Sequence, residues 1–360
     1  MRASLLIGTG AVAVAAIAIA VGCQTYDFEP VQPLAVAQTT QTFSTIGRSF
    51  RPNMALLVDK SGSMKQAVDP FNSACDIGAG LPSKCGQTGQ SLCPASCPTR
   101  WGDLNTAMQS FLVNNGTVAR FGLALYPASS GQCAPASTMS VPVSTSNDVN
   151  SELQATANQI LSTVAGTTPS GGTPTADSVR FVATNATLAD SQRDNFILLL
   201  TDGLPNCNLN NPNTYAGEPD TTCRCTDTNT SSCTAAPKLL CLDADATVAA
   251  IDGVRTTQNI RTIVVGFGAE TSSGDGPDVL RRMALAGGFP RTCSGGTDAE
   301  CGLGGVCDPT SKTCNPPFYQ ATNATDLAAV LAKIAKTISQ TPCNYFLAVT
   351  PSKPEFISVL

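Results

Sequence analysis

The chain has 360 residues, a formal net charge of −5 and no histidine. The missing imidazole excludes Ser-His-Asp and Cys-His catalysis and every zinc site with a histidine ligand. Basic residues form no cluster, which argues against nucleic acid as a partner. Only 13% of the residues are charged, and small polar residues, Gly and Pro are abundant. This composition indicates long ordered loops rather than a helical bundle.

Residues 1–22 predict a signal peptide of the lipoprotein type. After a short basic start, an apolar run extends from Leu5 to Val21. Gly22-Cys23 resembles a lipobox, in which Cys23 is lipidated and becomes the mature N-terminus. Small residues at Ala20 and Gly22 leave ordinary signal cleavage open, and the run is barely long enough for a transmembrane helix. We expect an exported outer membrane lipoprotein at the cell surface, which meets the membrane through its lipid anchor only.

After a tether at 23–48, apolar strand-like runs alternate with helical patterns. This order predicts an α/β fold with a doubly wound, mostly parallel sheet and one antiparallel edge strand. Strands are expected at 54–58, 121–126, 138–143, 195–201 and 260–266. Helices are expected at 101–112, 153–164, 177–185, 248–254, 280–284 and 323–339. Asn323 or Thr325 is the expected N-cap of the last helix.

Sixteen cysteines indicate an oxidising compartment. Most lie in three long loop insertions, at 68–100, 204–242 and 290–317, which we expect to be cross-linked by disulfides. A zinc site is the alternative for the pairs Cys93/Cys97 and Cys223/Cys225.

If Cys23 is lipidated, fifteen cysteines remain for disulfides. Residues 341–360 read as the start of a C-terminal β segment that stops in the middle of a strand. We therefore expect the natural chain to continue past Leu360 and to carry a further cysteine.

Asp59, Ser61 and Ser63 follow directly after the first buried strand. In a doubly wound sheet, ligands bind outside the carboxyl ends of the strands. Three oxygen side chains at alternating positions can therefore point inward from one tight loop, in which Gly62 permits the bend. The alternative is a simple turn that caps the next helix.

Two further segments favour a metal site. Thr173 lies in Gly171-Gly172-Thr173-Pro174 between two helices, and Asp202 ends the most apolar strand. By the order of the elements, both lie at the same sheet edge as Asp59. Five oxygen side chains without sulfur or nitrogen form a site for a hard cation, with Mg²⁺ favoured and Mn²⁺ or Ca²⁺ as alternatives.

These three motifs, D-x-S-G-S, G-G-T-P and T-D-G in this order, resemble those of the von Willebrand factor A (VWA) superfamily over residues 49–340. The resemblance implies a Rossmann-like domain with a metal-ion-dependent adhesion site. It implies that Ser61, Ser63 and Thr173 are oxygen ligands, and that Asp59 and Asp202 act directly or through water. It also implies a protein or extracellular surface ligand that offers a carboxylate to the metal.

The expected function is that of a cell-surface, lipid-anchored adhesin. The architecture also resembles, more distantly, the gliding-motility surface lipoproteins of bacteria. A structural scaffold of an envelope complex that does not use the metal is the alternative. An enzyme is not expected, because the sequence has no nucleophile elbow or phosphate loop, and Lys60 and Asp69 are poor candidates for a base.

Overall fold

The computed structural model describes residues 48–78, 83–87, 90–211, 224–226, 239–302, 305–339 and 345–346. The expected signal peptide, Cys23 and the possible continuation past Leu360 lie outside the described residues. One compact unit covers Phe50–Thr341. A second unit contains β1 (Arg48–Ser49) and β11 (Tyr345–Phe346), which pair antiparallel. Within the described ranges, no helix combines the length and the apolar character needed to cross a membrane.

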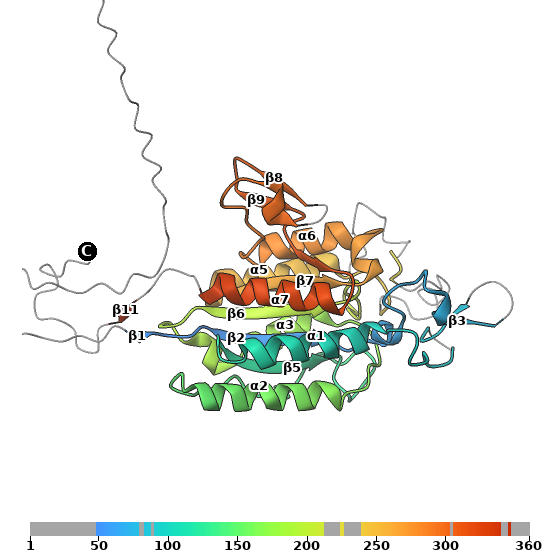
Figure 1. Cartoon of the computed structure of the whole chain (residues 1–360), viewed down its shortest axis with the longest axis horizontal. Helices are drawn as coiled ribbons and strands as arrows, with labels where there is room; N and C mark the ends of the chain where they lie inside the picture. Colours follow the sequence, from blue (N-terminus) through green and yellow to red (C-terminus); the bar gives the residue numbers. More distant parts are fainter. Residues whose placement is uncertain are drawn as a thin grey trace, which may run out of the picture. The chain divides into compact units, whose positions relative to one another are not determined.

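The larger unit is built on one sheet of five parallel strands in the order β10-β7-β6-β2-β5. Figure 1 shows β2, β5, β6 and β7 running side by side with helices along them. The strands are β2 (Asn53–Asp59), β5 (Arg120–Tyr126), β6 (Asn195–Thr201), β7 (Ile260–Phe267) and β10 (Tyr319–Ala321). Every residue of β2 and β6 is buried, as expected for central strands that are covered on both faces. The predicted fold class is therefore confirmed.

Six α-helices cover the two faces of the sheet within the described residues. They are α1 (Arg100–Asn115), α2 (Asn150–Ala165), α3 (Thr175–Ala183), α5 (Ala244–Gln258), α6 (Gly276–Ala286) and α7 (Ala324–Ser339). Helices α1, α2 and α7 pack with one face, and α3, α5 and α6 pack with the other. Of the two predicted N-caps of α7, Asn323 is the one used, because its side chain accepts a hydrogen bond from Asp326 N at 2.9 Å.

The strand expected at 138–143 is not formed as a strand. Val141 makes a single antiparallel bridge with Leu123 of β5, through hydrogen bonds of 2.8 and 3.1 Å. Beyond Val141 the chain bonds to β5 again, because Ser144 N donates to Phe121 O at 3.0 Å, but this bond is offset by one residue from a regular register, so no second pair forms. The predicted antiparallel edge is therefore reduced to this bridge. The sequence analysis also did not anticipate β10, which is only three residues long.

The cysteine-rich insertions are cross-linked, as expected. All twelve cysteines in the described ranges are disulfide-bonded. The disulfides include the pairs Cys75–Cys97, Cys85–Cys93, Cys133–Cys207, Cys293–Cys307 and Cys301–Cys314. The zinc alternative for Cys93 and Cys97 is wrong, because each sulfur is bonded to another cysteine.

The insertions carry little regular structure of their own. The first holds β3 (Asp76–Ile77) and β4 (Ser83–Lys84), and the third holds β8 (Val306–Asp308) and β9 (Thr313–Asn315). Five 3₁₀ turns complete the described structure: η1 (Gly62–Lys65), η2 (Ser73–Cys75), η3 (Ala186–Ala189), η5 (Ala269–Ser272) and η6 (Asp298–Cys301). Strand β3 lies beyond the carboxyl end of β2 (Figure 1). The first insertion therefore lies at the sheet edge where the metal site is expected.

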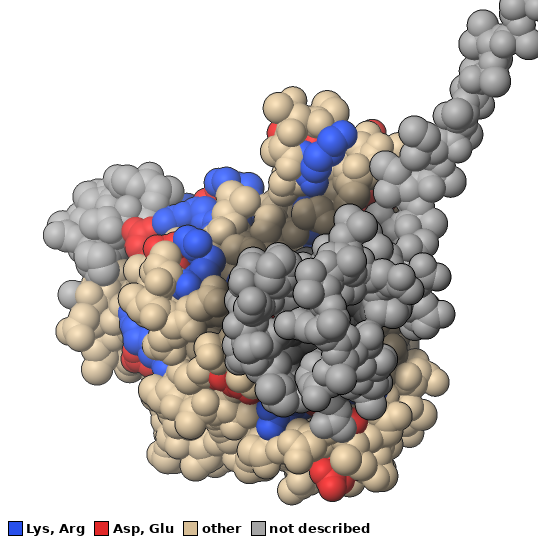
Figure 2. Space-filling model, turned by 90° about the vertical axis from the view of Figure 1, so that its left-hand side faces the viewer, with Lys and Arg blue, Asp and Glu red and all other residues tan. Residues whose placement is uncertain are grey.

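Several Arg–Asp ion pairs lie at the opposite edge of the sheet, where the strands begin. Arg193 pairs with Asp148 at 2.9 Å, and Arg261 of β7 pairs with Asp194 at 2.7 Å. Figure 2, which faces this end, shows blue and red side chains interspersed among the described residues. The described part of this face therefore offers no continuous basic surface of the kind that binds nucleic acid.

Truncating the centre of β6 should unfold the domain more readily. Leu198 is 0% exposed, so Leu198→Ala removes buried methyl groups and leaves a cavity, at a cost of about 2–5 kcal/mol in the free energy of unfolding. The matched control is Leu285→Ala on α6, whose side chain is 48% exposed and whose loss should cost within about 0.5 kcal/mol. Urea denaturation of both variants measures the difference, and equal midpoints would contradict the assignment of β6 to the core.

Candidate metal site

The three predicted motifs meet at the point where the chain switches direction across the sheet. Strand β2 leads to α1 on one face, whereas its neighbour β6 leads to α5 on the other. Loops that leave adjacent strands toward opposite faces open a crevice at their carboxyl ends. Asp59 is the last residue of β2, and Asp202 directly follows β6. Both aspartates therefore stand at this crevice.

The first loop is held by its own aspartate. Asp59 Oδ1 accepts a hydrogen bond from Ser61 N at 2.8 Å, and the turn η1 begins at Gly62. This is the simple turn considered as an alternative. The turn is present, but the Ser61 side chain does not cap η1, and the turn leaves Ser61 Oγ 2.9 Å from Ser63 Oγ. The turn and the cluster of oxygens are therefore compatible.

Hydrogen bonds join the three motifs to one another. Ser63 Oγ donates to Asp202 Oδ1 at 3.0 Å, which links the first motif to the third. Gly62 N donates to Gly171 O at 2.8 Å, which links the first to the second. Four of the five predicted side chains, those of Asp59, Ser61, Ser63 and Asp202, thus belong to one group.

Thr173 joins this group through its main chain. Its N–H donates to Asn206 Oδ1 at 2.7 Å, and its carbonyl accepts from Asn206 N at 3.0 Å. Asn206, four residues after Asp202, therefore fixes the second motif to the third. The sequence analysis did not single out Asn206, although a polar residue so close to Asp202 was a usable signal.

The two aspartates of the site are both buried, and their negative charges repel one another. Both are 0% exposed. Burial, and then the charge of Asp202, raise the pKa of Asp59 to about 7. Hydrogen bonds from Ser61 and from Thr201, whose hydroxyl donates to Asp59 Oδ2 at 2.8 Å, oppose this rise only in part. Without a cation, one of the two carboxyl groups therefore tends to hold a proton near neutral pH.

A buried arginine compensates the other carboxylate. Arg100, the first residue of α1, is 3% exposed and places Nη1 2.7 Å from Asp202 Oδ2. The sequence analysis did not include Arg100 in the site. It lies at the end of the first insertion, far from Asp202 in sequence, and no spacing rule connects the two.

The first insertion delivers this arginine. It starts soon after Ser63, and its ends are pinned together because Arg100 N donates to Gln66 O at 3.0 Å and Ala67 bridges Thr99. Disulfides Cys75–Cys97 and Cys85–Cys93 close the loop between these ends. The insertion therefore does more than rim the site, because its last turn supplies a charge to it.

A disulfide also fixes the second motif. Cys133 in the β5–α2 connection is bonded to Cys207, five residues after Asp202. A Cβ on Gly172 would lie 2.5 Å from Cys207 Sγ and 2.9 Å from Asn206 Oδ1, so only glycine fits there. The cross-link packs directly against the loop that carries Thr173.

The oxygen atoms fit a small hard cation. In an octahedral Mg²⁺ site with metal–oxygen distances of about 2.1 Å, neighbouring oxygen ligands lie about 3.0 Å apart. The distances of 2.9 Å between Ser61 Oγ and Ser63 Oγ and of 3.0 Å between Ser63 Oγ and Asp202 Oδ1 match this spacing. Because Ser63 donates its proton to Asp202, its oxygen keeps lone-pair density for a cation. The donor set is therefore suited to a divalent metal.

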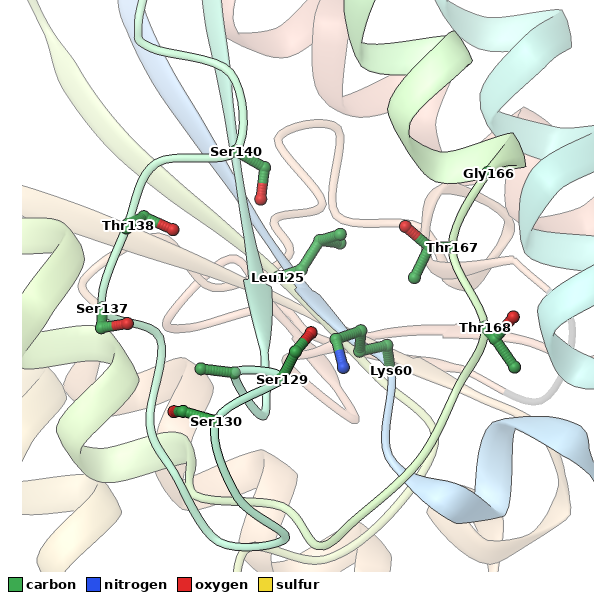
Figure 3. A pocket seen from close by; sticks show the side chains of 11 residues that line it. Lys60, Leu125, Ser129, Ser130, Ser137, Thr138, Ser140, Gly166, Thr167 and Thr168 are labelled. Carbon is green, nitrogen blue, oxygen red and sulfur yellow. The ribbon is translucent and has the colours of Figure 1, made fainter.

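Lys60 points away from this group. Burial lowers the pKa of its ammonium group, and the neighbouring Asp59 carboxylate partly opposes this effect. Its side chain lines a cavity beside the site (Figure 3). Nothing in this arrangement makes Lys60 a base for a substrate at the cation site.

The chain matches no family model and no curated protein. Among solved structures it is similar to the pilus adhesin SpaC from Lactobacillus rhamnosus GG, with 17% identity, a TM-score of 0.44, and coverage of 81% of this chain and 30% of that chain. It is also similar to the PilB minor pilin from Streptococcus sanguinis, with 17% identity, a TM-score of 0.43, and coverage of 81% and 62%.

A third similar structure is the vWF domain of the type V pili tip protein Mfa5 from Porphyromonas gingivalis. The identity is 12% and the TM-score 0.41, with coverage of 81% of this chain and 96% of that chain. VWA domains are thus among the structural neighbours. The chain spans less than two thirds of the SpaC and PilB chains. Because the TM-scores lie below 0.5, the fold assignment rests on the sheet order and connections described above.

The stability of the metal-free protein should depend on pH through Asp59. Its folded pKa of about 7 lies above the ordinary value of 3.8, so the folded state binds the proton more tightly than the unfolded state. The contribution of Asp59 to stability is therefore largest at low pH and is lost as the pH rises from about 4 to about 7, by at most about 1.4 kcal/mol per pH unit. Urea denaturation in EDTA measures this slope. In Asp59→Asn the slope should be reduced, and an unchanged slope would show that Asp59 is not the titrating group.

Replacing Arg100 should lower the stability of the metal-free protein and increase the stabilisation that a cation provides. Arg100→Met leaves Asp202 without its buried guanidinium partner, at a cost of about 3–5 kcal/mol in EDTA. The extra uncompensated negative charge should then enlarge the rise in melting temperature on adding Mg²⁺. The control Arg180→Met breaks an exposed ion pair with Asp177 and should change neither quantity. An equal or smaller Mg²⁺ response in Arg100→Met would contradict this account.

Proposed function

We propose that this chain is an adhesin module that binds a protein or an extracellular surface ligand through a divalent cation. Asp59, Ser61, Ser63, Thr173 and Asp202 would hold the ion, with Mg²⁺ favoured over Mn²⁺ and Ca²⁺. The observation that carries the proposal is the hydrogen-bonded group of oxygens from separate loops at the switch point of the sheet. When bound, the cation supplies a Lewis-acidic position for a ligand oxygen.

The protein groups define what kind of ligand fits. Asp59 holds the serine loop in its turn, and both of its oxygens already accept hydrogen bonds. This supports a role for Asp59 through water. With both carboxylates ionised, Asp59 and Asp202 carry two negative charges, of which Arg100 neutralises one. A divalent ion then leaves a net positive charge at the site, which favours a ligand carboxylate.

The cellular setting is part of the same proposal. The N-terminal sequence supports export with a lipid anchor at Cys23, and the disulfides support an oxidising compartment. An outer membrane lipoprotein displayed at the cell surface combines these features. A role in gliding motility remains a narrower hypothesis, and we expect no enzymatic turnover.

The test is divalent-dependent binding by variants that fold. Asp59→Ala should be exported and keep its circular dichroism spectrum, because the apolar strands β2 and β6 are unaffected. Binding to native extracellular material in Mg²⁺ should fall by about 10–100-fold. Ser61→Ala and Thr173→Ala should weaken binding by a smaller factor. Surface-matched binding assays with and without EDTA measure these effects.

The control for this test is Asp252→Ala on α5, which removes an exposed carboxylate outside the site and should bind normally. Full binding by Asp59→Ala, or binding that survives EDTA, would favour the alternative in which the domain is a scaffold that does not use the metal. Loss of binding in both variants would point to a general defect instead of a metal site.

A further inference from the structure

A cavity of about 510 Å³ opens beside the proposed metal site. Three chain segments form its walls: the start of the β5–α2 connection near Ser129, the return of that connection near Ser140, and the end of α2 near Thr167 (Figure 3). Seven of the eleven lining residues are Ser or Thr, and Leu125 supplies a large apolar side chain. The cavity is therefore rich in groups that both donate and accept hydrogen bonds.

Lys60 occupies the middle of this cavity. Figure 3 shows its side chain between the Ser129 and Thr167 walls. The residue is 5% exposed, and no hydrogen bond or salt bridge to its ammonium group occurs within the described part of the chain. Its ammonium group interacts with the neighbouring Asp59 carboxylate and is open to the cavity, so an anion that enters the cavity meets a positive charge there.

The main chain holds Lys60 rigidly in this place. Its N–H donates to Tyr126 O at 2.7 Å, and its carbonyl accepts from Ser170 N at 2.7 Å. These two bonds tie it to the ends of β5 and of the segment after α2, which are two of the walls. The main chain that carries the Lys60 side chain is therefore fixed relative to two walls of the cavity.

The C-terminal end of α2 opposes an anion, but only weakly. A helix end contributes roughly half a negative charge, whereas the ammonium group contributes a full positive one. Near the cavity, Gly166 N and Thr167 N bond to Ser162 O and Val164 O, which satisfies part of that end. The adjacent Asp59 carboxylate also opposes an anion, so the single ammonium group favours at most one negative charge on the ligand.

The size and lining of the cavity narrow the ligand class. Its volume lies within the range of about 300–1,000 Å³ that is typical of small-molecule sites. A small carboxylate such as acetate would fill only a small part of the cavity. The lining holds no aromatic side chain on which a nucleobase could stack. A ring that carries several hydroxyl groups and one carboxylate uses both the hydroxyl-lined walls and Lys60.

We propose that this cavity binds an acidic sugar, a hexuronic acid unit whose carboxylate pairs with Lys60 and whose hydroxyl groups bond to the serine and threonine walls. The site needs no metal. It adds recognition of an acidic saccharide next to the cation site and goes beyond the proposed divalent-dependent adhesion.

The experiment measures binding of D-glucuronic acid by the folded protein in EDTA, with saturation-transfer NMR and calorimetry. Lys60→Met keeps the length of the side chain without its charge, and it should weaken glucuronate binding by about tenfold or more. Thr167→Val removes one hydroxyl at nearly constant shape and should weaken it by a smaller factor. Lys336→Met, an exposed lysine on α7, is the control and should bind as the unaltered protein does.

Three further probes decide the ligand class. Glucose should bind more weakly than glucuronate, because it lacks the carboxylate. Acetate should also bind more weakly, because it lacks the hydroxyl groups. Acetate binding as tight as that of glucuronate would reduce the cavity to a simple anion site and overturn the proposal, as would tighter binding of an aspartate-containing tripeptide.

Unchanged glucuronate binding by both folded variants, Lys60→Met and Thr167→Val, would also overturn it. Because every measurement is made in EDTA, failure here is independent of the divalent-dependent adhesion. Conversely, Asp59→Ala tests that adhesion without removing any residue that lines the cavity.

Discussion

Two fully buried carboxylates at the ends of adjacent strands, Asp59 on β2 and Asp202 after β6, impose the constraint around which the rest of this site is organised. Two like charges side by side in a low-dielectric position are unfavourable unless something compensates them. The chain compensates Asp202 with Arg100, and both aspartates with hydrogen bonds from hydroxyl and main-chain groups. Burial and the remaining repulsion from Asp202 raise the pKa of Asp59. A divalent cation would relieve the same repulsion, which is why the raised pKa and the proposed function share one physical origin.

The disulfide-bonded insertions help to meet this constraint. The first insertion is closed by two disulfides and ends at Arg100, so a loop that would otherwise be costly to order places a guanidinium beside Asp202. The disulfide Cys133–Cys207 joins the connections after β5 and β6 and packs against Gly172 in the loop of Thr173. Cross-links therefore hold together loops from three different parts of the chain where a cation would need them in one geometry.

Asp59 and Lys60 are neighbours of opposite charge, and each belongs to one of the two proposed binding positions at this edge of the sheet. Successive side chains at a strand end point to opposite sides, so Asp59 faces the oxygen cluster while Lys60 faces the hydroxyl-lined cavity. If both proposals hold, these two positions side by side would discriminate ligands by chemistry, since one would attract a carboxylate through a metal and the other through an ammonium group.

The sequence by itself determined the central strands and most of the candidate ligands. Continuous apolar runs such as 195–201 have no stable place except a doubly covered sheet, and residues that directly follow such runs must emerge at one edge. Asp59, Ser61, Ser63 and Asp202 were found for that reason. The partners that complete the site depended on tertiary structure, because Arg100 and Cys133 reach it across separations that no local period encodes. Asn206 is close to Asp202 in sequence, but its bond to Thr173 was decided by the packing of two separate loops. Residues 138–143 show the converse, since their apolar pattern was legible in the sequence, yet only their register against β5 decided that the edge strand shrinks to one bridge. The cavity around Lys60 likewise exists only because three distant segments pack together, so its electrostatics belong to the fold and not to any motif.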